Sequence, residues 1–86
     1  MKTREEEISR AKQAQQLLRN ELLTEAFDEL ERLYSETWRS TTPSQTEARE
    51  KVYFLLQALS HVRTHIEQVV TTGEMAELSR QQLHLN

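Results

Sequence analysis

Between positions 48 and 70, apolar side chains recur every three or four residues, which is the longest regular pattern in the chain. Such spacings bring side chains onto one side of an α-helix, so this stretch predicts a long amphipathic helix. Its members are Ala48, Val52, Leu55, Leu56, Leu59, Val62, Ile66, Val69 and Val70. Because a helix of this kind is stable only when another surface covers its apolar side, other helices or other chains must supply that surface.

Thr3 and Glu6 mark the start of a first helix. A threonine followed three residues later by a glutamate fits a capping box, in which each side chain bonds the backbone of the other residue. The acidic residues at positions 5–7 suit the positive end of a helix dipole. We therefore predict a helix over about residues 4–19.

The apolar pattern changes phase beside Asn20. The series that begins at Leu23 starts one residue late, which turns the apolar stripe by about 100°. Asparagine is equally suited to end one helix and to start the next. We predict a break at Asn20 and a second helix over about residues 21–39, and one unbroken helix over residues 4–39 is the alternative.

Residues 40–44, with the sequence Ser-Thr-Thr-Pro-Ser, form the clearest turn in the chain. Because proline suits the first turn of a helix, the long helix is expected to begin within this segment. Gly73 follows the apolar stripe, at a position where a glycine commonly ends a helix in the left-handed conformation. We therefore predict a third helix over about residues 44–72 and a short or frayed C-terminal helix over residues 74–83.

The composition predicts an all-α fold. One glycine and one proline allow few tight turns, whereas glutamate, glutamine, leucine, arginine and alanine are abundant and favour helices. We predict a single helical domain over residues 1–86, built as an antiparallel helical hairpin with an extra N-terminal helix. That helix either completes a three-helix bundle or leaves two hairpins to pair as an oligomeric bundle.

The stripe of the long helix is assigned to the core and to self-association. The residues are Val52, Leu55, Leu56, Leu59, Val62, Ile66 and Val69. A two-helix hairpin covers only part of so much apolar surface, so we expect a homo-oligomer. The sequence has no cysteine, so packed apolar surface rather than disulfides or thiolate metal sites must stabilise the fold.

A second set of residues lies on the opposite side of the same helix. It contains an aromatic residue, a small residue and two histidines at spacings of three and four, which suggests a contact surface for another protein. The residues are Phe54, Ala58, His61 and His65. The alternative is that Phe54 caps the edge of the bundle or meets the folded-back first helix.

His61 and His65 also have the spacing with which two imidazoles can face one metal ion. A zinc site needs more ligands, and the residues between them include no carboxylate and contain Arg63, which would repel a cation. We therefore expect solvated or interface histidines, no metal site and no cofactor. The sequence has no glycine-rich phosphate loop and no nucleophile elbow, so we expect no enzymatic activity.

The formal net charge of −3 argues against a dedicated nucleic-acid binder, whose surface carries a basic excess. Positive side chains do occur in the first helix and before it, interleaved with glutamates. They are Lys2, Arg4, Arg10, Lys12 and Arg19. This pattern therefore argues against nucleic acid as a partner. No apolar run approaches the roughly 20 residues of a membrane span.

Several features occur together over about residues 17–75. They are Leu22-Leu23-x-x-Ala26-Phe27, Trp38 shortly before Thr42-Pro43, Glu47-Ala48-Arg49-Glu50-Lys51, and Gly73 behind Val69-Val70. In these features the chain resembles the small helical proteins that tailed bacteriophages encode among their head-assembly and packaging genes. The resemblance implies a viral protein of phage or prophage origin that acts in virion assembly and binds a larger phage structural protein.

The same resemblance implies a location in the cytoplasm of the bacterial host or in the virion. Among phage proteins, a DNA-associated packaging factor similar to the small subunit of a terminase, or a regulatory factor, is the alternative to a structural protein. A structural protein and a DNA-associated factor differ in whether the chain contacts DNA. The acidic start of the second helix argues against such a contact.

Overall fold

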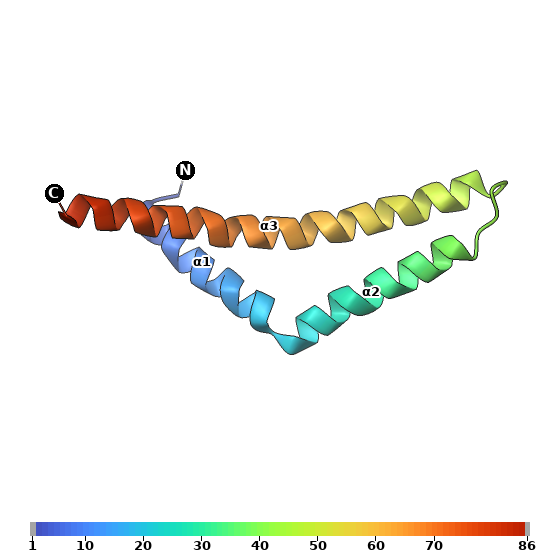
Figure 1. Cartoon of the computed structure of the whole chain (residues 1–86), viewed down its shortest axis with the longest axis horizontal. Coiled ribbons are helices and arrows are strands. Elements are labelled where there is room, and N and C mark those ends of the chain that lie inside the picture. The colour runs from blue at the N-terminus through green and yellow to red at the C-terminus, as the bar shows by residue number, and fades with distance from the viewer. Residues whose placement is uncertain (1, 86) are drawn as a thin grey trace. The chain divides into compact units, whose positions relative to one another are not determined.

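The computed structural model describes residues 2–85 and their side chains as far as Leu83. It contains three α-helices, α1 (Arg4–Arg19), α2 (Glu21–Arg39) and α3 (Thr46–Leu85), shown in Figure 1. No β-strand occurs between residues 2 and 85. The predicted all-α fold is therefore confirmed.

Helix α1 begins and ends where local sequence predicts. The side-chain oxygen of Thr3 accepts a hydrogen bond from the backbone N–H of Glu6 at 3.2 Å, as an N-cap should. At the other end, Asn20 has φ −71° and ψ 116°, an extended conformation that interrupts the helix. The predicted break is present, and the alternative of one continuous helix is wrong because an extended residue cannot continue the helical hydrogen bonds.

The turn before α3 is closed by Thr42 and Gln45. The backbone N–H of Thr42 donates to the side-chain oxygen of Gln45 at 2.7 Å, and the N–H of Gln45 donates to the carbonyl of Thr42 at 3.0 Å. These two bonds hold Pro43 within the turn rather than in the first turn of a helix. As a result α3 begins at Thr46, two residues later than predicted.

Gly73 lies inside α3, which continues without a break to Leu85. The prediction that Gly73 ends the long helix, with a separate helix over residues 74–83, is therefore wrong. Gly73 lacks the positive φ of a left-handed cap. Its role is steric instead, because a Cβ atom at this position would overlap the Cβ of Ala11 and lie 2.8 Å from the carbonyl oxygen of Glu7.

The helices group into two compact units, each built from two helical segments. The first unit contains α1 and residues 64–85 of α3, which run in opposite directions (Figure 1). Its buried residues are Ile8, Ala11, Ala14, Gly73 and Ala76. Most of them are small, which lets the two backbones come close but leaves a thin core.

The second unit is the α2–α3 hairpin, formed by α2 and residues 46–63 of α3. Phe27 and Val52 are its buried apolar residues. The guanidinium of Arg63 lies 5.0 Å from the centroid of the Phe27 ring, and that of Arg49 lies 4.4 Å from the ring of Trp38. Because early residues of α2 meet late residues of this segment, the predicted antiparallel hairpin is confirmed.

Candidate functional site

The predicted apolar stripe of α3 divides into a covered part and an exposed part. Val52 is buried, with 8% of its surface exposed. Four residues of the stripe are half-buried, namely Leu56, Leu59, Ile66 and Val69. Leu55 and Val62 remain 45% and 53% exposed. The stripe is therefore wider than the surface that one neighbouring helix covers.

Arg63 lies on the side of α3 that α2 covers, although the apolar pattern does not include this position. Its side chain stacks on Phe27 and reaches a carboxylate oxygen of Asp28 at 3.4 Å. The long aliphatic stem of an arginine can pack against an apolar neighbour while its charge stays near water. A helical wheel assigns Arg63 to the solvent by residue type, so the sequence reasoning missed this contact.

Contacts on one flank of the α2–α3 hairpin are polar. Arg63 pairs there with Asp28, and a small groove on this flank is lined by Glu31, Leu56, Leu59, Ser60 and Arg63. Near the turn, Arg49 donates through Nε to the Thr41 hydroxyl at 2.8 Å. Asp28 and Glu31 of α2 therefore lie on the same flank of the hairpin as Ser60 and Arg63 of α3.

The other flank of the α2–α3 hairpin is mainly apolar, although Lys51, four residues before Leu55, lies on the same side of α3. On α2 its residues follow each other at spacings of four, four and three, and on α3 at spacings of three and four. We call this set the apolar face; its members are Leu22, Ala26, Leu30, Leu33, Leu55, Ala58 and Val62. All seven are exposed, and Leu22 is 75% exposed. The polar side of α2 and the polar side of α3 lie on the same flank of the hairpin. Helix geometry therefore puts the apolar side of α2 and the apolar side of α3 together on the opposite flank.

The predicted partner surface of α3, which shares Ala58 with the apolar face, is also exposed. Phe54 is 59% exposed, and Ala58, His61 and His65 are exposed as well. The ring of Phe54 lies 6.2 Å from that of Tyr53, tilted by 59°, so two aromatic rings meet near the turn end of α3. The structure brings Phe54, Ala58 and His61 onto the hairpin, whereas His65 belongs to the unit that contains α1.

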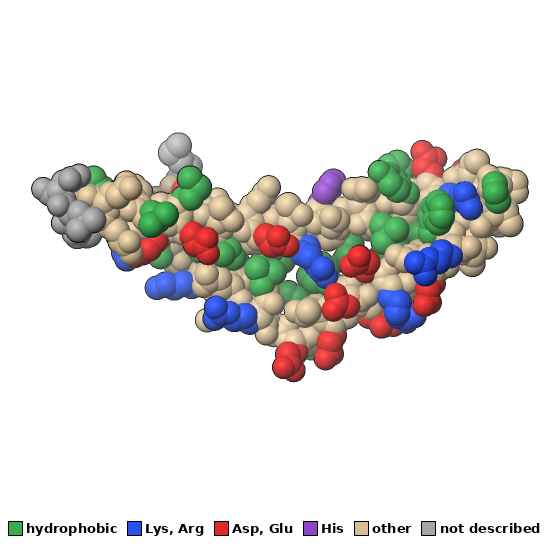
Figure 2. All heavy atoms as spheres, in the orientation of Figure 1, with side chains coloured by type: hydrophobic (Ala, Val, Ile, Leu, Met, Phe, Trp, Pro, Cys, Tyr) green, Lys and Arg blue, Asp and Glu red, His purple; other side chains and the backbone are tan. Residues whose placement is uncertain are grey.

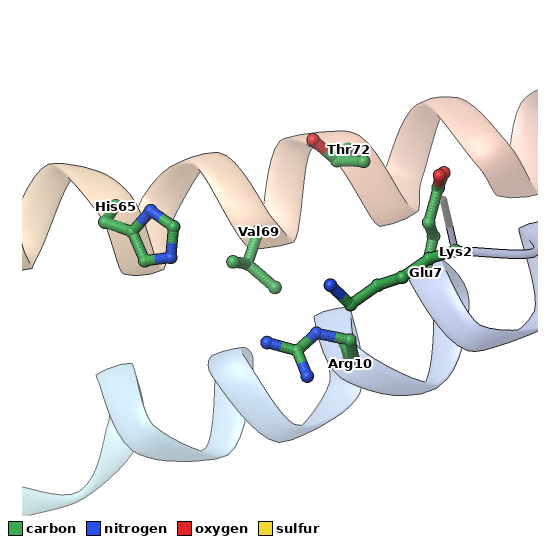
Figure 3. A pocket seen from close by; sticks show the side chains of 6 residues that line it. All are labelled: Lys2, Glu7, Arg10, His65, Val69 and Thr72. Carbon is green, nitrogen blue, oxygen red and sulfur yellow. The ribbon is translucent and has the colours of Figure 1, made fainter.

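His65 lies at a cleft of about 300 Å³ between α1 and the second half of α3. In Figure 3, Lys2 and Arg10 reach into this space from one side, and His65 and Val69 face it from the other. Glu7 and Thr72 complete the lining. The excess of positive groups can attract an anion, but the cleft holds no nucleophile paired with a base.

Charged side chains gather along the outer side of α2, as Figure 2 shows. Arg32 pairs there with Glu29 and, at 2.9 Å, with Glu36. The hydrogen bond from Arg32, together with its positive charge, lowers the pKa of Glu29 below the ordinary value of a glutamate. This side of the hairpin therefore carries paired charges, in contrast to the apolar face.

Within the described residues, no group of three or more histidine, aspartate or glutamate side chains is arranged to hold a metal ion. The described helices also include none that is long and apolar enough to cross a membrane. Comparison of the chain with protein-family models, with curated protein sequences and with solved structures finds no significant match.

Proposed function

We propose that this chain is a non-enzymatic assembly protein that associates with copies of itself through its helices and binds a larger protein partner. The observation that carries the proposal is the pattern of burial. Among the described residues, six hydrophobic ones are buried, and no side chain is completely covered. Twelve large hydrophobic residues are exposed. Folded monomers rarely leave extended apolar patches in water, so such a pattern favours a surface that another chain covers.

Sedimentation velocity over a dilution series tests the self-association. At micromolar concentration the purified chain should sediment as a dimer or larger species and dissociate only on dilution. A 10.2 kDa monomer at every concentration, still cooperatively unfolding, would contradict the proposal. In that case the two helical pairings described above would be sufficient for stability by themselves.

The resemblance to small head-assembly proteins of tailed phages supports a phage structural protein as the larger partner. On this proposal the chain acts in the bacterial cytoplasm and either leaves or stays when the particle matures. Quantitative mass spectrometry of purified particles and of their precursors tests the setting. The chain should occur in at least one of the two at a reproducible copy number, and its absence from both would contradict a role in assembly.

A DNA-associated packaging factor is the second candidate, and the cleft near Lys2 and Arg10 favours it. With a net charge of −3, few phosphate contacts are available to one surface, so duplex binding should be weak at physiological salt. A fluorescence titration at two salt concentrations decides between the candidates. Submicromolar affinity that collapses as salt rises, and that is lost in an Arg10→Gln/Lys12→Gln variant, would establish the DNA role instead.

A further inference from the structure

We infer that the cleft between α1 and residues 64–85 of α3 binds a small ligand that carries a phosphate or diphosphate group. The cleft lies within the first compact unit of a single chain, so the inference does not depend on the proposed self-association. Its volume of about 300 Å³ is at the lower end of the range for small-molecule sites. The side chains that carry the inference are those of Lys2, Arg10 and His65.

Basic side chains converge on this cleft from both helical segments. In Figure 3 the ammonium group of Lys2 and the guanidinium of Arg10 point into the space from the side of α1, and His65 faces it from α3. The planar fork of an arginine matches two phosphate oxygens at once, and an ammonium group adds a compact positive charge. Val69 is half-buried and adds an apolar wall, which strengthens the attraction of the cations for an anion.

The positive charge of the cleft is not neutralised by a neighbouring carboxylate. Neither Lys2 nor Arg10 forms an ion pair with another described residue. The carboxylate of Glu7 belongs to the lining but points away from both cations in Figure 3. Two like charges that face one space repel each other, and an anion bound between them removes this repulsion. The arrangement therefore favours an anionic ligand over a neutral one.

A second groove between the same two helical segments gives an internal comparison. It lies on the other side of the helix crossing and is lined by two basic and two acidic side chains, so its charges balance. One of its cations, Arg80, donates to a carboxylate oxygen of Glu77 at 2.5 Å. The other cation is Lys12, and the second acidic residue is Glu74. This groove therefore lacks the excess of positive charge that distinguishes the cleft.

A phosphate group in the cleft would connect α1 with α3. Arg10 belongs to α1 and His65 to α3, so one anion in contact with both bridges the two segments. The residues buried between these segments are mostly small and form a thin core. A ligand that binds only the folded chain stabilises it in proportion to the logarithm of its concentration. Thermal unfolding should therefore report binding as a rise in the midpoint with added ligand.

Calorimetric titration of the full chain with sodium pyrophosphate, at constant ionic strength, tests the site. The native chain should bind one pyrophosphate, and the unfolding midpoint should rise with its concentration. Lys2→Gln and Arg10→Gln should each weaken binding by about tenfold or more, because each removes a charge-assisted hydrogen bond. Lys12→Gln is the matched control, since it removes a charge from α1 at the other groove, and it should change the affinity by less than about twofold.

A map of the native chain covers the case in which a variant does not fold. Pyrophosphate added to the isotope-labelled chain should shift the NMR signals of the backbone amides around Arg10, His65 and Val69. The signals around Arg32 and Arg49, two arginines of the α2–α3 hairpin, should stay unchanged. Shifts around every basic residue alike would show unspecific attraction to positive charge and would overturn the site.

A short DNA duplex titrated at the same ionic strength tests the source of the phosphate group. We expect the duplex to bind more weakly than pyrophosphate, because a cleft of this size suits one or two phosphate groups rather than a continuous backbone. A duplex that binds and loses affinity in Arg10→Gln, while pyrophosphate does not bind, would overturn the small ligand in favour of DNA. Equal pyrophosphate affinities of Arg10→Gln and Lys12→Gln, or no binding by the native chain, would overturn the cleft as a site and leave self-association unaffected.

Discussion

Gly73 and Ala11 lie so close that the two helices carrying them could not approach as they do if residue 73 had a side chain. A Cβ atom there would overlap that of Ala11 and would lie 2.8 Å from the carbonyl oxygen of Glu7. A glycine within a helix costs about 1 kcal/mol relative to alanine. The helix therefore gives up intrinsic stability at this position in exchange for close packing against α1.

Gly73→Ala should lower the free energy of unfolding by about 1–2 kcal/mol, because the overpacking cost exceeds the gain in helix propensity. Urea unfolding followed by circular dichroism measures the change. Thr72→Ala, an exposed substitution on the same helix, is the control and should change stability by less than about 0.5 kcal/mol. A Gly73→Ala variant that is more stable than the native chain would show that α1 does not pack against this part of α3.

Arg63→Ala should destabilise the α2–α3 hairpin by about 1–2 kcal/mol, because it removes the stacking on Phe27 as well as the ion pair. Asp28→Asn removes only the ion pair, whose carboxylate is 67% exposed, and should cost about 0.5 kcal/mol or less. Urea unfolding of both variants in low and high salt measures the difference. Equal losses that disappear together at high salt would assign the whole effect to charge and would contradict a role for stacking.

The single tryptophan provides a direct probe of the turn. The guanidinium of Arg49 covers one side of the Trp38 ring and also bonds the Thr41 hydroxyl. Arg49→Ala should therefore shift tryptophan emission to longer wavelength, increase quenching by acrylamide and cost about 1 kcal/mol. Lys51→Ala is the control on the same helix. Unchanged emission in Arg49→Ala would mean that Trp38 is held without the arginine.

One asparagine and one glycine show which parts of the fold the sequence predicts and which it does not. Asn20 interrupts the helices as predicted, because the phase of the apolar pattern and a residue suited to capping point to the same place. The prediction that the long helix ends at Gly73 is wrong. A glycine after an apolar stripe has the same local sequence whether it caps a helix or lies where two helices cross. Only its neighbour across the interface, Ala11, distinguishes the two, and that contact is 62 positions away in sequence.

The candidate surface was predictable in part for a similar reason. The three-and-four spacing identifies Leu55 and Val62 as apolar positions of the long helix, together with Val52. It cannot say that α2 covers Val52 and leaves Leu55 and Val62 exposed, because that depends on how the two helices are rotated against each other. The stacking of Arg63 on Phe27 depends on the same rotation.

The pKa of Glu29 should rise towards its ordinary value in Arg32→Gln, because the hydrogen bond and the charge that lower it are removed. A lowered pKa in the folded state means that the contribution to stability is present above the unfolded pKa and is lost as pH falls through the folded one. The stability difference between the native chain and Arg32→Gln should therefore shrink on acidification. NMR titration of the Glu29 carboxyl carbon measures the shift, with Arg39→Gln as a control that removes a charge from the same helix. An unchanged Glu29 titration would contradict the pairing.

Thermal unfolding at two protein concentrations tests most directly whether association completes the fold. For a dimer that dissociates as it unfolds, a hundredfold higher concentration favours the folded state by about 2.7 kcal/mol. The midpoint should then rise by roughly 5 °C or more. We expect this rise for the native chain. A midpoint that is the same at both concentrations for the native chain would contradict self-association as the basis of its stability.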